Sequence, residues 1–226
     1  MKPHNRKRWY DSYYRTFSKY SYLKHLWNLM HLKKMNFFDE VSPDSVIVDV
    51  GCGDGNMLKT LSSKGYRKLY GFDIKIPRVY DKRFQLKKGT MLNMPYPKGF
   101  ADVLICFNSM HHLLNYRQYD LFLKNVKRVL KNGGKFFMVE PQRNIFRKLQ
   151  DLIIKIPIIS DVGIVKERKI VIQEERKELE KFLNIDIVKL FKSQGFDIYT
   201  YRSYLKSFIL YCYSKPKRKK AEGRQA

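Results

Sequence analysis

The stretch Val48-Asp49-Val50-Gly51-Cys52-Gly53-Asp54-Gly55 decides the fold of this chain. A β-branched run that ends near an acid leads directly into three glycines at alternate positions, and a helical pattern follows from Met57 to Ser63. Glycines let the backbone turn tightly and let a ligand approach more closely than a Cβ would allow. A strand, a glycine-rich turn and a helix in this order are typical of α/β folds that bind nucleotides at the end of the first strand.

The spacing of the glycines narrows the class of ligand. A dinucleotide fingerprint reads G-x-G-x-x-G, and this chain has Asn56 where the third glycine would fall. No Lys-Ser/Thr pair follows the glycines, which excludes a P-loop. A second acid, Asp73, ends the next apolar run, 22 positions after Gly51. A carboxylate there suits a ribose with two free hydroxyls and would repel a 2′-phosphate.

Strand-like and helical patterns alternate on both sides of this stretch. Apolar runs predict strands at 46–50, 69–72, 84–87, 101–107 and 135–140, and then at 196–201 and 206–213. Helices are predicted from Tyr116 to Leu130, between an Asn115/Gln118 capping box and Asn132-Gly133, and over the charged stretch 173–194. The alternation predicts an α/β fold: a Rossmann-like, doubly wound, mostly parallel seven-stranded sheet with helices on both faces and a terminal antiparallel hairpin.

Positive charge is dense at both ends of the chain. The 226 residues carry a net charge of +25, from 46 Lys/Arg against 21 Asp/Glu. Residues 1–34 hold nine Lys/Arg and one acid, and residues 215–226 hold six and one. Such ends attract polyanions, whether RNA or an anionic membrane surface, and solubility alone is an equally good account of the terminal tail.

Other classes of protein find little support in the composition. The three cysteines, Cys52, Cys106 and Cys212, lie far apart, so we expect neither disulfides nor a metal site, and buried thiols in a reducing compartment. The most apolar stretch, 152–165, is interrupted by Lys155, Pro157 and Asp161, so no transmembrane segment is predicted. No apolar run follows the basic first residues as in a secretion signal, and a cytoplasmic location is expected.

Several segments in order resemble class I S-adenosylmethionine-dependent methyltransferases of the type 11 group. Val48–Gly55 is similar to the first motif, Asp73 to the acid that holds the cofactor's ribose, and Gly89–Tyr96 to the loop beside the adenine. Residues 100–113 and 133–136 are similar to the fourth strand with its loop and to the turn into the fifth strand. The resemblance implies S-adenosyl-L-methionine as cofactor, bound by Asp49, Gly51, Cys52, Gly53, Gly55, Asp73, Ile74, Thr90, Met91, Leu92 and Asn108.

Two of these positions have a second interpretation. The family usually has an aspartate where this chain has Thr90, so the adenine contact is made by a hydroxyl or moves to the backbone near Met91. Asp49 either caps the turn that follows it or orients the loop or the amino group of the cofactor.

The resemblance also suggests how the chain is organised. Residues 1–40 are expected to form a basic, aromatic, helical extension whose apolar stripe packs on the core, serves as a lid over the cofactor, or does both. Residues 41–214 would form the methyltransferase domain, with a substrate-side insertion at 141–172, and residues 215–226 a disordered basic tail.

Methyl transfer from a sulfonium mainly requires alignment, and a general base is needed only if the acceptor must lose a proton. The candidates for such a base are His111 and His112 after the fourth strand, and Glu140 at the end of the fifth. The alternative is structural: the two histidines begin a structural loop, and Glu140 caps the turn at Pro141.

The sequence indicates the acceptor of the methyl group less directly than it indicates the cofactor. The apolar insertion at 141–172 suggests a pocket for a small-molecule or lipid-linked acceptor, although core packing explains it equally well. An RNA methyltransferase is the alternative, and the positive net charge favours it. Methylation of base amino groups is disfavoured because no [DN]-P-P-[YF] motif follows the fourth strand. Methylation of cytosine C5 is disfavoured because that chemistry needs a pair of cysteines and Cys106 stands alone. A non-catalytic cofactor-binding scaffold is a third hypothesis, which the intact glycine loop and Asp73 disfavour.

Overall fold

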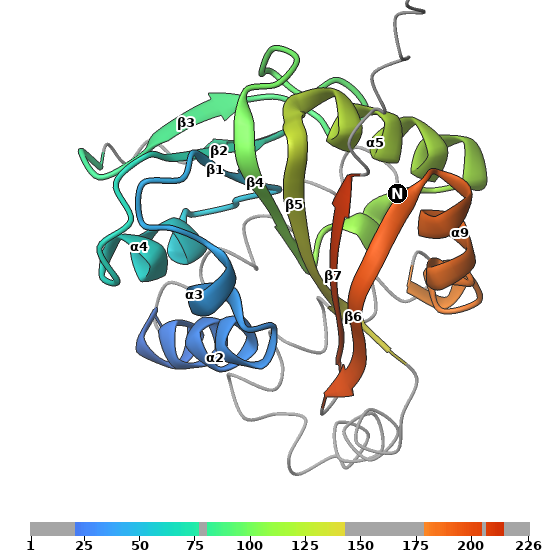
Figure 1. Ribbon diagram of the computed structural model, residues 1–226, viewed down its shortest axis with the longest axis horizontal. Coiled ribbons are helices and arrows are strands. Elements are labelled where there is room, and N and C mark those ends of the chain that lie inside the picture. Colours follow the sequence, from blue (N-terminus) through green and yellow to red (C-terminus); the bar gives the residue numbers. More distant parts are fainter. Residues whose placement is uncertain (1–20, 77–80, 143–178, 205–206, 215–226) are drawn as a thin grey trace, which may run out of the picture.

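The computed structural model describes residues 21–76, 81–142, 179–204 and 207–214. Seven strands form one sheet in the order β3-β2-β1-β4-β5-β7-β6 (Figure 1). Strands β1 to β5 are parallel to their neighbours, and β7 runs antiparallel to both β5 and β6. The predicted fold class, with its terminal antiparallel hairpin, is confirmed. The strands are β1 Ile47–Val50, β2 Leu69–Asp73, β3 Gln85–Lys88, β4 Ala101–Phe107, β5 Leu130–Pro141, β6 Phe196–Tyr204 and β7 Ser207–Ser214.

Helices cover both faces of the sheet (Figure 1). On one face lie α2 (Ser21–Lys34), α3 (Phe37–Glu40) and α4 (Asn56–Ser62), and on the other lie α5 (Tyr116–Val129) and α9 (Ile187–Ser193). Successive strand residues point to opposite faces, so Ile47 and Val48 enter different hydrophobic clusters, as do Phe136 and Phe137. Because both faces are covered, β1 is buried along its whole length.

Strand β5 begins five residues earlier than predicted. Leu130 pairs with Ala101 directly after α5 ends at Val129, and the register then shifts before Lys135 pairs with Val103. The predicted cap at the start of α5 is present, since the Asn115 side chain accepts a hydrogen bond from the Gln118 backbone N–H over 3.1 Å. The Asn132-Gly133 turn therefore lies inside β5 and not at the end of the helix.

The single helix predicted over 173–194 is wrong for the part that the structure describes. The helical backbone stops at Phe182, four non-helical residues follow, and α9 begins at Ile187. The Asp186 side chain accepts a hydrogen bond from the Lys189 backbone N–H at 2.9 Å, which makes it an N-cap. A charged run that reads as one helix is therefore divided by a capping residue within it.

Helix α2 packs on α4 through polar side chains. His25 Nδ1 and Asn28 Nδ2 lie 3.1 and 3.2 Å from Thr60 Oγ1. The apolar stripe predicted in residues 1–40 includes Leu23 and places it on the packing face, but its side chain is 60% exposed. The neighbouring Tyr22 and Leu26 are exposed as well. The rest of the stripe before residue 21, most of the insertion at 141–172 and the tail at 215–226 lie outside the described residues.

Within the described ranges, no helix is both long and apolar enough to cross a bilayer.

Candidate cofactor and active site

The glycine loop is held at the carboxyl end of β1 by its neighbours. The backbone N–H groups of Gly51 and Cys52 donate to the Phe72 carbonyl at 2.9 and 3.1 Å, which ties the loop to β2. A Cβ on Gly51 would lie 2.5 Å from Ser109 Oγ, so glycine is required there by close packing. At Gly53, by contrast, φ is +53° and a Cβ would meet nothing within 4 Å. This glycine leaves an open side on the loop, where a ligand can approach the backbone.

Three carboxylates surround this loop. Asp73 accepts hydrogen bonds from the backbone N–H groups of Gly53, at 3.0 Å, and Lys75, at 3.1 Å. Asp49 is 3% exposed, and within the described part of the chain no donor bonds to its carboxylate. The pKa of Asp49 is raised well above its ordinary value, mainly by burial and further by the negative charges of Asp73 and Asp54. Burial likewise raises the pKa of Asp73. A cationic ligand with an amino group would supply the donor and the charge that Asp49 lacks.

The buried charge of Asp49 should cost stability when no ligand is bound. We expect Asp49→Asn to stabilise the unliganded protein at neutral pH by about 1 kcal/mol, or roughly 3 °C in Tm, and to weaken cofactor binding. The pKa of Asp49 is raised in the folded state, so the folded protein binds a proton on this carboxyl more tightly than the unfolded chain does. The free energy of unfolding therefore falls as pH rises through the raised pKa. Thermal melting of both proteins between pH 5 and pH 8 checks this: a variant less stable than the wild type throughout would contradict it.

The loop predicted beside the adenine lies next to the glycine loop. The Met91 methyl group would be 3.4 Å from a Cβ placed on Gly51. Thr90 Oγ1 accepts a hydrogen bond from the Asn93 backbone N–H at 3.0 Å, and a hydroxyl oxygen can accept one more. The Leu92 carbonyl accepts a bond from Asn125 Nδ2 at 3.0 Å, which anchors the loop to α5. Ile74, directly after Asp73, is 39% exposed.

The loop after β4 is organised by one buried carboxylate. Glu140, at 0% exposure, accepts backbone hydrogen bonds on Oε1 from Ser109 and Met110, at 2.8 and 2.6 Å. Its Oε2 lies 2.7 Å from His111 Nδ1, and His111 is itself buried. Asn108 has a left-handed φ of 51°, and its N–H donates to the Val139 carbonyl at 2.7 Å. The structure thus brings together His111 and Glu140, two of the three residues predicted as catalytic.

His112 has different surroundings. It is half-buried, and its ring centroid lies 4.2 Å from that of His111. The pKa of Asp73 is raised by burial and lowered by its backbone hydrogen bonds and, to a smaller degree, by a positive charge on His112. Of the two histidines, His112 is therefore the one that acts electrostatically on Asp73.

Helix α2 adds residues that the sequence did not indicate. Lys24 Nζ lies 3.2 Å from a carboxylate oxygen of Asp54 in the glycine loop. Burial lowers the pKa of Lys24, and Asp54 partly opposes that effect. The Trp27 ring meets the ring of Phe107, the last residue of β4, edge to face at 5.9 Å. No local pattern marks these contacts, because each joins residues at least 30 positions apart.

The cysteines do not form a reactive cluster. Cys52, Cys106 and Cys212 are free and buried, and burial raises the pKa of each thiol. The Cys52 side chain packs against Gly71 of β2, so only its backbone is placed to contact a ligand on the glycine loop. Among the described residues, no group of three or more His, Cys, Asp or Glu side chains is arranged to hold a metal ion.

Comparison with known proteins agrees with this geometry. Residues 48–138 match a family model described as a methyltransferase domain, Methyltransf_11. A tRNA (carboxymethyluridine(34)-5-O)-methyltransferase of Arabidopsis thaliana is 31% identical over 101 residues, which cover 43% of this chain and 24% of the relative. A probable S-adenosylmethionine-dependent methyltransferase of Mycolicibacterium smegmatis is 26% identical over 110 residues, 46% of this chain and 41% of the relative. The chain thus spans less than half the length of these two curated relatives.

A crystal structure of a methyltransferase from Methanosarcina mazei shares the fold. Its TM-score is 0.56 at 19% identity, and the match covers 80% of this chain and 97% of that one. Strand order, glycine loop, family match and shared fold together define the class: the chain carries a class I S-adenosylmethionine-dependent methyltransferase domain. This family model covers residues 48–138, which is less than half of the chain.

Proposed function

We propose that this chain transfers a methyl group from S-adenosylmethionine to an RNA acceptor. One observation supports the methyl-transfer part of this proposal. Asp49 is buried with no donor among the described residues, beside the open side of Gly53 and within the field of Asp73. A site built in this way fits a cationic ligand that has an amino group and a ribose.

Each of these residues would then have a distinct role in binding. Asp73 would accept hydrogen bonds from the ribose hydroxyls while it continues to hold the Gly53 N–H. Asp49 would accept from the amino group, and Thr90 and Met91 would lie against the adenine. The bound cofactor supplies an activated methyl group, and the protein supplies the alignment for an in-line displacement.

The three predicted catalytic residues divide into two roles. Glu140 already accepts three hydrogen bonds and is fully buried with His111, so we assign this pair to positioning the loop after β4. His112 is half-buried beside the cofactor acids and is the candidate general base where the acceptor must lose a proton.

Two observations support RNA as the acceptor. The Arabidopsis relative is named as a methyltransferase that acts on tRNA. In addition, this chain carries a net charge of +25, and a protein that is positive overall is drawn to a phosphate backbone.

A small-molecule or lipid-linked acceptor is the second candidate, and α2 provides its specific observation. This helix exposes Tyr22, Leu23 and Leu26, and it carries Trp27 against Phe107 at the end of β4. An apolar helix face next to an aromatic wall suits a hydrophobic acceptor or the surface that presents one.

One experiment separates these candidates. Purified protein is incubated with methyl-labelled S-adenosylmethionine and either total tRNA or a lipid extract, at several salt concentrations. We expect label in the RNA, and transfer that falls steeply as salt rises. Label in the lipid fraction with little dependence on salt would replace RNA by the second candidate. Saturable cofactor binding without transfer to any fraction would point to a non-catalytic scaffold. An Asp73→Ala variant, which should transfer nothing, controls for contaminating enzymes.

A further inference from the structure

A third concentration of positive charge lies inside the folded domain. Residues 59–88 hold ten Lys/Arg and only two acids, Asp73 and Asp81. Asp73 is half-buried and accepts the Gly53 N–H, so part of its charge is already engaged by the glycine loop. Of the nine that the structure describes, six lie on α4, in the turn into β2 or directly before β3, namely Lys59, Lys64, Arg67, Lys68, Lys82 and Arg83; Lys75 follows β2, and Lys87 and Lys88 lie in β3. The domain surface there is therefore basic independently of the two chain ends.

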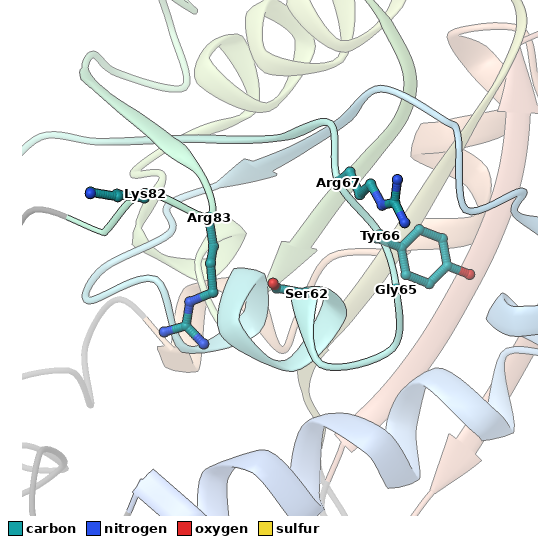
Figure 2. A pocket seen from close by; sticks show the side chains of 6 residues that line it. All are labelled: Ser62, Gly65, Tyr66, Arg67, Lys82 and Arg83. Carbon is teal, nitrogen blue, oxygen red and sulfur yellow. The ribbon is translucent and has the colours of Figure 1, made fainter.

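A cleft is present at the centre of this surface. It has a volume of about 370 Å³ and is lined by Ser62, Gly65, Tyr66, Arg67, Lys82 and Arg83. Figure 2 shows Tyr66 and Arg67 on one side of the last turn of α4 and Lys82 and Arg83 on the other, with the Lys82 side chain pointing away from that turn in this view. Two chain segments supply the lining, one from α4 to β2 and one directly before β3. Tyr66 is buried, and its hydroxyl donates to the Val41 carbonyl at 2.9 Å, so part of the lining is fixed to the core.

The cations of the cleft are available to a ligand to different degrees. Arg83 is oriented by Asp81, which it contacts through Nε at 2.9 Å and Nη2 at 2.6 Å. Arg67 and Lys82 are exposed, and neither is paired with an acid among the residues that the structure describes. Proteins bind phosphate oxygens through cationic side chains, oriented guanidinium groups and hydroxyls. The cleft offers all three kinds of group: two uncompensated cations, an oriented guanidinium and the Ser62 hydroxyl.

We propose that this cleft binds a phosphodiester group of the RNA and so anchors the acceptor away from the reacting atom. The inference rests on the proposed RNA acceptor. An RNA backbone is favoured over a membrane because, among the residues that the structure describes, no exposed large apolar side chain lines the cleft. The exposed side chains of Lys64 and Lys68 continue the basic surface beyond it, as a repeating polyanion requires.

The position of the cleft suits an anchor. Helix α4 leads from the glycine loop at Asn56 to the cleft at Ser62, and seven helical residues span about 10 Å. At about 3.4 Å per nucleotide along one strand, that length corresponds to roughly three nucleotides. An RNA held in the cleft would therefore need only a few nucleotides to reach the glycine loop.

The test compares two variants with the same change in charge. Arg67→Glu with Lys82→Glu alters the cleft, and Lys98→Glu with Lys189→Glu alters two exposed lysines elsewhere. The affinity for a fluorescent single-stranded RNA is measured by anisotropy at several salt concentrations. We expect the cleft variant to bind roughly 10- to 100-fold more weakly, with a salt slope smaller by about 2, and the control to change only a few-fold. Equal losses in both variants would overturn the proposal.

Three further measurements make the outcome decisive. Unchanged thermal melting and unchanged S-adenosylmethionine affinity show that the cleft variant is folded. Wild-type protein that binds anionic vesicles but not RNA would overturn the proposal in favour of a membrane. The methylation assay is read separately. If RNA binds through the cleft but receives no label, the cleft proposal stands and the proposed acceptor is refuted. If RNA is labelled and the cleft variant binds it as the wild type does, the proposed acceptor stands and the cleft proposal is refuted.

Discussion

We expect the replacement of Asp73 with alanine to weaken S-adenosylmethionine binding by roughly 100-fold or more. A carboxylate that accepts hydrogen bonds from two ribose hydroxyls contributes about 3 kcal/mol, since each bond to a charged group is worth about 1.5–3 kcal/mol. The variant also frees the Gly53 N–H, which the carboxylate holds at 3.0 Å, so the glycine loop loses part of its support. Calorimetric titration of the purified variant with S-adenosylmethionine and with S-adenosylhomocysteine measures the change.

Two further variants show whether the effect is specific. Asp39→Ala removes an exposed acid on α3, outside the cofactor site, and should bind the cofactor as the wild type does. Asp73→Asn keeps one acceptor oxygen and should fall between the wild type and the alanine variant. If a folded Asp73→Ala protein retained wild-type affinity, the proposed position of the ribose would be wrong.

Replacing Glu140 with alanine destabilises the protein by about 3–5 kcal/mol and abolishes methyl transfer. Removal of a buried carboxylate leaves the backbone N–H groups of Ser109 and Met110 and the His111 ring without their acceptor, and buried pairs broken in this way cost that much. The same change releases the loop after β4, which packs under Gly51 through Ser109. Urea unfolding gives the free energy of unfolding, and single-turnover methylation gives the activity.

A second glutamate of this domain serves as the matched control. Glu40 is partly exposed and pairs with Lys135 and the Tyr211 hydroxyl, so Glu40→Ala should cost only about 1 kcal/mol and leave transfer intact. Glu140→Gln keeps one oxygen for the backbone donors and should retain more stability than the alanine variant. A Glu140→Ala protein as stable as Glu40→Ala would mean that the loop does not depend on this carboxylate.

Local sequence was sufficient to predict the sheet and its glycine loop. Strand β4 matches its predicted bounds, and Asp49, Gly53 and Asp73 do meet at the carboxyl ends of β1 and β2. These features depend on short patterns: β-branched runs, glycine spacing and an acid at a strand end. Patterns of this kind are set within a few residues, so they can be read without knowledge of the rest of the chain.

The parts that sequence did not reveal depend on contacts between distant segments. Glu140 is predicted as a candidate general base, but its hydrogen bonds to Ser109 and Met110 span about 30 residues and support the proposal that it positions a loop. The pair between Lys24 and Asp54 is equally non-local. Asp186 is different, because its bond to the Lys189 backbone N–H is local: an aspartate within a charged run can occupy a helix interior or an N-cap, and the pattern around it does not distinguish the two.

The antiparallel insertion of β7 between β5 and β6 has a consequence for synthesis on the ribosome. Seven residues of β5, from Lys135 to Pro141, obtain their outer backbone partners only from Ser207 to Tyr213. Until that last strand has been translated, the nascent domain presents an unpaired edge that includes Phe137, Met138 and Val139. Open apolar edges invite pairing with other chains, so this edge is exposed to aggregation until β7 has been made.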